Sequence, residues 1–152
     1  RRVLFRSVVG LVIVQTLDSV TRSQAYQADR TQSLDSMRLV LNTMTKELRQ
    51  ATAVDDANST ANYIVFTTYV RGVSHTVTYQ ASGTTLQRRL DGGAWISVQT
   101  GLTTTSIFTY QSAPPVPGAQ WVRIVLQVKP QRDPETNLVL DSEVNLRNRV
   151  TS

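Results

Sequence analysis

The stretch LDSMRLVLNTMTKELRQA, residues 34–51, decides the fold of this chain. Apolar side chains recur along it in steps of three and four residues, the period of one face of an α-helix. The members of this stripe are Leu34, Met37, Leu41, Met44, Leu48 and Ala51. A helix with one apolar stripe buries it against a folded core, so we expect these residues to form a helix–sheet core.

The predicted helix extends far upstream of the stripe, from about Val8 to Ala53. Residues 21–33 are polar nearly all round, whereas residues 8–14, VVGLVIV, are apolar on every side. The first proline is residue 114, and Gly10 is the one glycine before residue 72, so nothing within the stretch interrupts a helix. The alternative is two ordinary helices that are separated in the polar region.

Apolar residues in the upstream half form a second candidate surface, which we call the assembly helix. They are Leu11, Ile13, Val14, Leu17 and Val20. The continuous apolar run at 8–14 is far shorter than the roughly 20 residues that span a bilayer. Residues 3–7, VLFRS, match the translation of a common sequencing adapter. We therefore expect residues 1–7 to be non-native and the native N-terminus to lie further upstream.

After Ala53 the apolar period changes to two, which is typical of strands. We expect four strands, at 63–70, 74–80, 84–90 and 94–98, to form an antiparallel meander because the tight-turn sequences RG, SG and DGG join them. Further strands are predicted at 106–111, 120–129 and 137–146. Both faces of residues 120–129 are partly apolar, which indicates a central strand.

These patterns predict an α+β fold, in which a long N-terminal helix packs on an antiparallel β-sheet of six or seven strands. The predicted divisions are residues 1–7, the helix half at 8–33, and a globular domain at 34–152. Within the helix half, the polar residues 21–33 are expected to project from the domain as a stalk. Three prolines make residues 113–118 a loop.

Composition excludes several classes of protein. The chain contains no cysteine, which rules out disulfides and thiolate metal sites. Its net charge is +5, but Arg1, Arg2 and Arg6 supply three of the 16 basic residues; the other 13, against 11 acidic residues, leave +2. Basic residues do not cluster elsewhere or alternate with aromatic residues, so no nucleic-acid partner is evident.

The residues that could support catalysis are few. The single histidine, His75, lies on a predicted strand and has no cysteine with which to pair. The pair Asp55-Asp56 offers fewer oxygen ligands than a calcium loop uses, and we interpret it as a solvated helix end. Gly92-Gly93 lacks the lysine and helix start of a phosphate loop. Trp95 and Trp121 are expected to pack on the sheet or helix. We predict no catalytic residues, no cofactor and no metal.

Three short segments resemble one family. They are MTKELRQA at residues 44–51, LQRR at 86–89 and VNLRN at 144–148. Following a long N-terminal helix, they resemble the minor pilins and pseudopilins of type IV pilus and type II secretion systems, nearest to the J-type minor pseudopilin and the PilW-like minor pilins. The family's leader, its cleavage-site glycine and its glutamate five residues into the mature chain are not found here; Phe5 is followed four residues later by Val9.

The resemblance implies a structural, non-enzymatic subunit that assembles through its N-terminal helix. Its partners would be other pilin or pseudopilin subunits, and its helix would lie in the inner membrane before assembly, with the globular domain extracytoplasmic, and in the filament or at the cell surface afterwards. The alternative is a periplasmic or cell-surface binding module without catalytic activity, in which the 114–118 loop and exposed aromatic residues contact a ligand.

Overall fold

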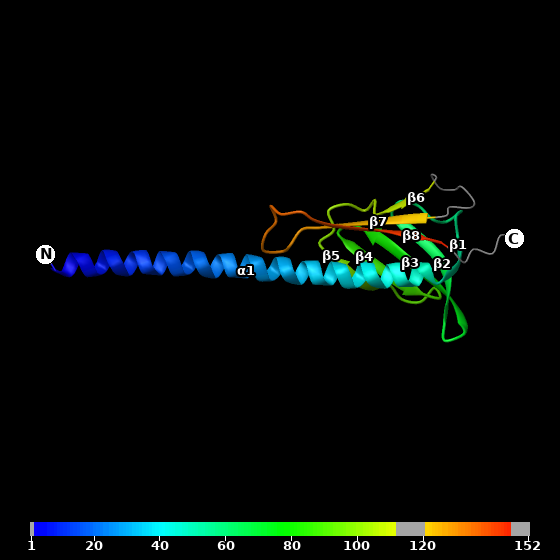
Figure 1. The fold of residues 1–152 in the computed structure, drawn as a ribbon, viewed down its shortest axis with the longest axis horizontal. Helices are drawn as coiled ribbons and strands as arrows, with labels where there is room; N and C mark the ends of the chain where they lie inside the picture. The colour runs from blue at the N-terminus through cyan, green and yellow to red at the C-terminus, as the bar shows by residue number, and fades with distance from the viewer. Residues whose placement is uncertain (1, 112–120, 147–152) are drawn as a thin grey trace.

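A computed structural model describes residues 2–111 and 121–146 of the chain, and the side chains of the first helix from residue 17 onward. One unbroken helix, α1 (Arg2–Arg49), precedes a β-rich domain (Figure 1). At 1.5 Å per residue its 48 residues span about 72 Å. The alternative of two separate helices is therefore wrong, and the predicted α+β class is confirmed.

Within the described residues, the domain contains eight strands in two antiparallel sheets. The five-stranded sheet has the order β1-β2-β3-β4-β5, and the three-stranded sheet has the order β6-β7-β8. The strands of the first sheet are β1 (Ala51–Val54), β2 (Tyr63–Val70), β3 (Val73–Ser82), β4 (Thr85–Leu90) and β5 (Ile96–Thr100). Those of the second are β6 (Phe108–Tyr110), β7 (Trp121–Val128) and β8 (Leu138–Asn145).

The predicted meander is confirmed as strands β2 to β5, which pair in sequence order. Arg71 and Gly72 form the β2–β3 turn with φ angles of 53° and 82°, the left-handed backbone that a two-residue hairpin turn requires. The central position of residues 120–129 is also confirmed, because β7 pairs with β6 on one side and with β8 on the other. The 113–118 loop lies outside the described residues.

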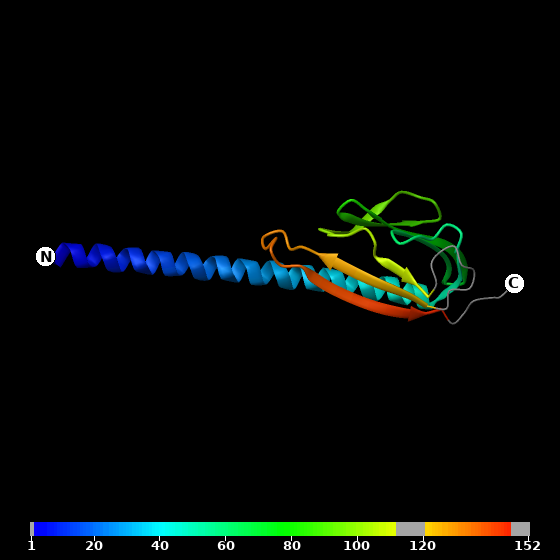
Figure 2. The ribbon, with the colours of Figure 1, turned by 90° about the horizontal axis from the view of Figure 1, so that it is seen from above.

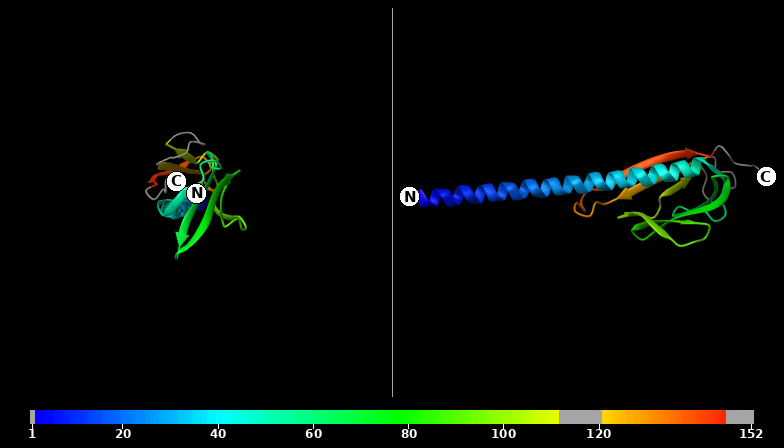
Figure 3. Two further views of the ribbon diagram at one scale, coloured as in Figure 1. Left: turned by 90° about the vertical axis from the view of Figure 1, so that its right-hand side faces the viewer. Right: turned by 90° about the horizontal axis from the view of Figure 1, so that it is seen from below.

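The core lies between α1 and the two sheets. In the end-on view of Figure 3, α1 lies between the five-stranded and the three-stranded sheet, and Figure 2 shows that the three-stranded sheet follows the helix lengthwise. The helix contacts β8 and β7 in one sheet and β5 and β2 in the other. One apolar cluster joins the three layers, with Phe66, Tyr79, Ile124 and Leu126 among its buried members.

Two predictions about this architecture were wrong. The helix ends at Arg49 rather than near Ala53, because residues 51–54 pair with β2 as an edge strand, in which Ala51 lies opposite Thr68. The single predicted sheet is two sheets. After β5 the chain turns at Gly101 (φ 78°), and Leu102 bridges to Val128, which carries the chain across the core to the second sheet.

Smaller differences concern the ends of elements. The helix also includes residues 2–7. The fourth meander strand begins at Ile96 rather than at residue 94, because the preceding turn extends through Gly93, whose N–H donates to the Leu90 carbonyl. Asp55 does not end a helix. It follows β1, and its carboxylate accepts hydrogen bonds from the backbone and side-chain nitrogens of Asn58, at 3.1 and 2.7 Å.

Candidate functional site

The predicted helix–sheet core residues lie at the centre of the domain. Met37, Met44 and Leu48 have no exposed surface, and Leu41 is 8% exposed. Leu34 is half-buried at the edge of the domain. Ala51 is buried as well, but it belongs to β1 rather than to the helix.

The assembly helix lies outside the domain. Leu17 and Val20 are 61% and 48% exposed, and side chains 17–24 are all exposed. Leu11, Ile13 and Val14 are part of α1, but their side chains are not described. No helix in the described part of the chain has the length and apolar character that a membrane crossing requires. In Figure 1 the N-terminal half of α1 extends beyond the sheets as a single rod.

Contact between helix and domain starts earlier than predicted. The backbone N–H of Arg132 donates to Asp29 Oδ2 at 2.7 Å, and Arg30 Nη2 donates to Thr136 Oγ1 at 3.1 Å. Arg30 also lies 3.7 Å from the carboxylate of Asp133. The β7–β8 loop therefore holds the polar helix at Asp29 and Arg30, upstream of the predicted boundary at residue 34. Polar contacts of this kind do not change the spacing of apolar residues, so the sequence pattern did not predict them.

A polar cluster fixes the end of α1 to the five-stranded sheet. Arg88 Nη2 donates to Glu47 Oε1 at 2.6 Å, and the Tyr79 hydroxyl donates to Glu47 Oε2 at 2.6 Å. The side chains of Glu47 and Arg88 are 19% and 24% exposed. Burial, and next the charge of Glu47, raise the pKa of Tyr79 well above its usual range. The cluster therefore orients the end of the helix on the sheet.

His75 lies at the surface of the sheet with one charged neighbour. Its Nδ1 is 2.7 Å from Asp91 Oδ2, and since a carboxylate accepts only, Nδ1–H is the donor. Asp91 Oδ1 accepts from the Thr76 N–H at 2.8 Å. These two hydrogen bonds, the one from His75 foremost, lower the pKa of Asp91. The arrangement closes the β4–β5 turn onto β3, which is a structural role.

The two tryptophans lie on the sheets. The guanidinium of Arg89 stands over the ring of Trp95 at 4.6 Å from its centroid, a cation–π contact. Trp121 begins β7 and is half-buried. Both positions agree with packing roles.

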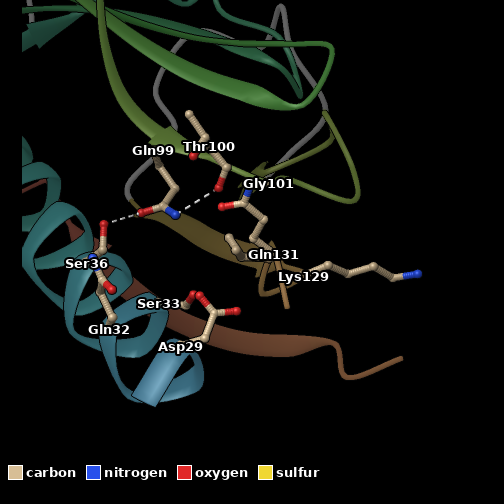
Figure 4. A pocket seen from close by; sticks show the side chains of 10 residues that line it. Asp29, Gln32, Ser33, Ser36, Gln99, Thr100, Gly101, Lys129 and Gln131 are labelled. Atoms are coloured by element: carbon tan, nitrogen blue, oxygen red, sulfur yellow. Dashed lines mark hydrogen bonds between the residues drawn. The ribbon is translucent and has the colours of Figure 1, made fainter. Parts of the chain in front are cut away.

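A polar pocket of about 460 Å³ opens where α1, the end of β5 and the end of β7 meet (Figure 4). One wall is fixed by Gln99, which is 7% exposed. Its Oε1 accepts from Ser36 Oγ at 2.8 Å and its Nε2 donates to the Thr100 carbonyl at 2.9 Å. The helix supplies Asp29, Gln32 and Ser33, and Gln131 lies on the side of Gly101 and Lys129 in Figure 4. Lys129 lies at the rim and extends away from the opening in Figure 4.

The sequence did not indicate this pocket or the contacts at Asp29 and Arg30. The one available signal was the pair of charges in the otherwise uncharged helix segment 23–33. Among the described residues, no group of three or more histidine, aspartate or glutamate side chains is placed to hold a metal ion. Comparisons with protein-family models, with curated proteins and with solved structures find no match to this chain.

Proposed function

We propose that the chain is a structural subunit of a type IV pilus or type II secretion filament, of the minor pilin or pseudopilin class. One observation carries the proposal: the C-terminal half of a single helix packs in the buried core, and its N-terminal half extends beyond the domain. The resemblance of the three sequence segments supports the same class.

The upstream half of α1 carries apolar surface that the domain does not cover. Leu17 and Val20 are exposed on a rod that carries Leu11, Ile13 and Val14 further upstream. Burying such surface against neighbouring helices contributes about 25 cal/mol per Å². Parallel packing of these rods would place the helices at the centre of a filament and the sheet domains on its outside. Before assembly, the proposal places this half of the helix in the inner membrane and the domain on the extracytoplasmic side.

The proposal includes no catalytic activity and no cofactor. Its partners are other pilin or pseudopilin subunits. The alternative class, a periplasmic or cell-surface binding module, draws its support from the polar pocket. In such a module the upstream half of α1 would have no task in assembly, which separates the two proposals experimentally.

The test introduces charge into the assembly helix of the full chain. Ile13→Asp and Leu17→Asp should remove the chain from sheared filaments in cells that carry the filament machinery, because a buried unpaired charge opposes helix packing. Gln24→Asp is the matched control, since it adds the same charge at an exposed polar position of the same rod. All three chains should share the wild-type melting temperature of the domain. Incorporation of Leu17→Asp at the wild-type level would contradict the proposal.

A further inference from the structure

The β2–β3 hairpin extends beyond the rest of its sheet. β1 pairs with β2 no further than Thr68, and β4 pairs with β3 no further than Val77. The tip between these positions projects at the end of the domain opposite to the N-terminus (Figure 1). Tyr69, Val70 and Val73 are 54%, 47% and 57% exposed there. An isolated two-stranded ribbon that displays apolar side chains is typical of a surface that another molecule covers.

Arg71 is the charged residue of this tip. It is exposed, and it makes no hydrogen bond or ion pair to any residue in the described part of the chain. The left-handed backbone at this position suits glycine, asparagine or aspartate better than arginine. The turn itself therefore does not account for the guanidinium.

The polar pocket lies at the other end of the domain. Its lining includes one carboxylate, that of Asp29, and one cation, Lys129, whose side chain extends away from the opening (Figure 4) and leaves room for a guanidinium beside the carboxylate. Asp29 supplies a carboxylate with one oxygen, Oδ1, that is not used by the Arg132 N–H. The side chains of Gln32, Ser33 and Gln131 line the pocket and have no hydrogen-bond partner among the described residues. A guanidinium presents five N–H donors in a planar fork, which suits one carboxylate surrounded by amide and hydroxyl oxygens.

An exposed apolar side chain, that of Tyr26, also lies close to the pocket. Tyr26 is 45% exposed and precedes Asp29 and Ser33 by three and seven residues, so the three lie on one face of α1. A hairpin tip that places its charged residue in the pocket would bring its tyrosine and valines to the neighbourhood of this ring.

We infer that the polar pocket binds the Arg71 guanidinium of a second copy of this chain, with the hairpin tip covering the mouth of the pocket. The β2–β3 turn and the β7–β8 loop, which begins at the pocket, lie at opposite ends of the domain (Figure 1), so one molecule cannot close the contact on itself. A contact between unlike surfaces is heterologous and repeats along an open assembly. The inference rests on the proposed filament function and adds a domain contact to the packing of helices.

The test uses the absence of cysteine, since every thiol in the experiment is then an introduced one. Full-length Tyr69→Cys, which leaves Arg71 in place, carries one tag and is mixed in detergent with full-length Gln32→Cys carrying another, and a short bis-maleimide is added. A product that carries both tags should form severalfold more than with Asn145→Cys, an exposed position on β8, in place of Gln32→Cys. Equal yields in the two mixtures would overturn the inference.

Charge reversal gives the second readout. The thiols stay at Tyr69→Cys and Gln32→Cys, and every chain of the mixture also carries Arg71→Asp, which suits the left-handed turn. The cross-linked yield should then fall about tenfold, equivalent to about 1.4 kcal/mol. Adding Asp29→Arg should restore it, because the pair is then reversed. Asp29→Asn is the matched control: it keeps an acceptor for the Arg132 N–H and removes only the charge, so it should weaken the contact without restoring the Arg71→Asp chain.

Failure of the two proposals can be told apart. A chain that enters filaments but gives no excess of the two-tag product contradicts the Arg71 contact alone. A chain that gives the product but enters no filament contradicts the proposed function, and leaves the pocket as a contact between copies. An unchanged yield with Arg71→Asp overturns the inference, since it shows that the guanidinium is not in the contact.

Discussion

The two halves of α1 differ in what covers them. Between Met37 and Leu48 the apolar stripe is buried between two sheets, whereas Leu17 and Val20 face solvent on the same unbroken helix. Helix formation itself is common to both halves, so it does not explain the difference. The burial of one stripe explains the stability of the domain, whereas the exposed residues Leu17 and Val20 add nothing to its core.

The boundary between the halves is formed by polar contacts. At Asp29 and Arg30 the β7–β8 loop contacts the helix before any core residue does. We call these hydrogen bonds at Asp29 and Arg30 the collar. They lie where the helix extends beyond the domain, and they fix its direction relative to the sheets.

The largest effect is expected in the buried half. Leu48→Ala should lower the free energy of unfolding by about 2 to 5 kcal/mol, because it removes a fully buried side chain and leaves a cavity between helix and sheets. Leu39→Ala is the matched control, since Leu39 is 69% exposed on the same helix and should change stability by less than about 0.5 kcal/mol. Urea unfolding followed by circular dichroism measures both. Equal effects would mean that the stripe does not hold the domain together.

A smaller loss is expected from the polar cluster at the end of the helix. Glu47→Gln should destabilise the protein by about 1 to 3 kcal/mol, because the partly buried guanidinium of Arg88 loses its charged partner. Glu143→Gln, at an exposed position on β8, is the control and should leave stability within about 0.5 kcal/mol of wild type. If both substitutions are neutral, the cluster orients the helix without stabilising it.

The collar can be tested by truncation. A chain that starts at Gln27 keeps Asp29 and Arg30, and we expect it to fold and remain in solution because the apolar stripe and both sheets are complete. A chain that starts at Leu34 loses the hydrogen bonds to the β7–β8 loop and should be less stable by about 1 kcal/mol. Thermal melts of the two chains compare them directly. Unfolding of the longer chain would show that the upstream half belongs to the domain.

The elements with strong periods could be predicted from the sequence. The stripe at 34–48 and the apolar residues of β7 repeat over enough positions to identify a helix and a central strand. β1 was missed because Ala51 follows Leu48 by three residues, which fits a continuing helix as well as a short edge strand. The division into two sheets depends on which strands pair after Gly101, and alternation within a strand does not specify its neighbours.

The candidate surfaces differ in the same way. The exposed residues Leu17 and Val20 could be listed from sequence, because they lie close together in one element. The polar pocket could not, because it joins residues 29–36, 99–101 and 128–131, which only the fold brings together. The turn at Arg71-Gly72 was predicted, yet its projection depends on where β1 and β4 stop pairing.

The smallest effect is expected at the sheet edge, where Asp91 holds the β4–β5 turn to β3. Its pKa is lowered in the folded protein, so the ionised carboxylate contributes stability above its unfolded pKa, and this contribution is lost as the pH falls through the folded value. Asp91→Asn should therefore lower the melting temperature slightly at neutral pH, and the difference from wild type should disappear in acid, below the normal range of an aspartate.

Asparagine tolerates the left-handed backbone at this position (φ 51°), so the substitution tests the charge and not the turn. His75→Gln should reproduce part of the loss, because it removes the Nδ1–H donor and leaves the Thr76 N–H in place. A difference between wild type and Asp91→Asn that persists in strong acid would show that the carboxylate acts by shape alone. The turn backbone, and not the charge of Asp91, would then hold the β4–β5 turn to β3, just as packing holds the buried half of α1 in place.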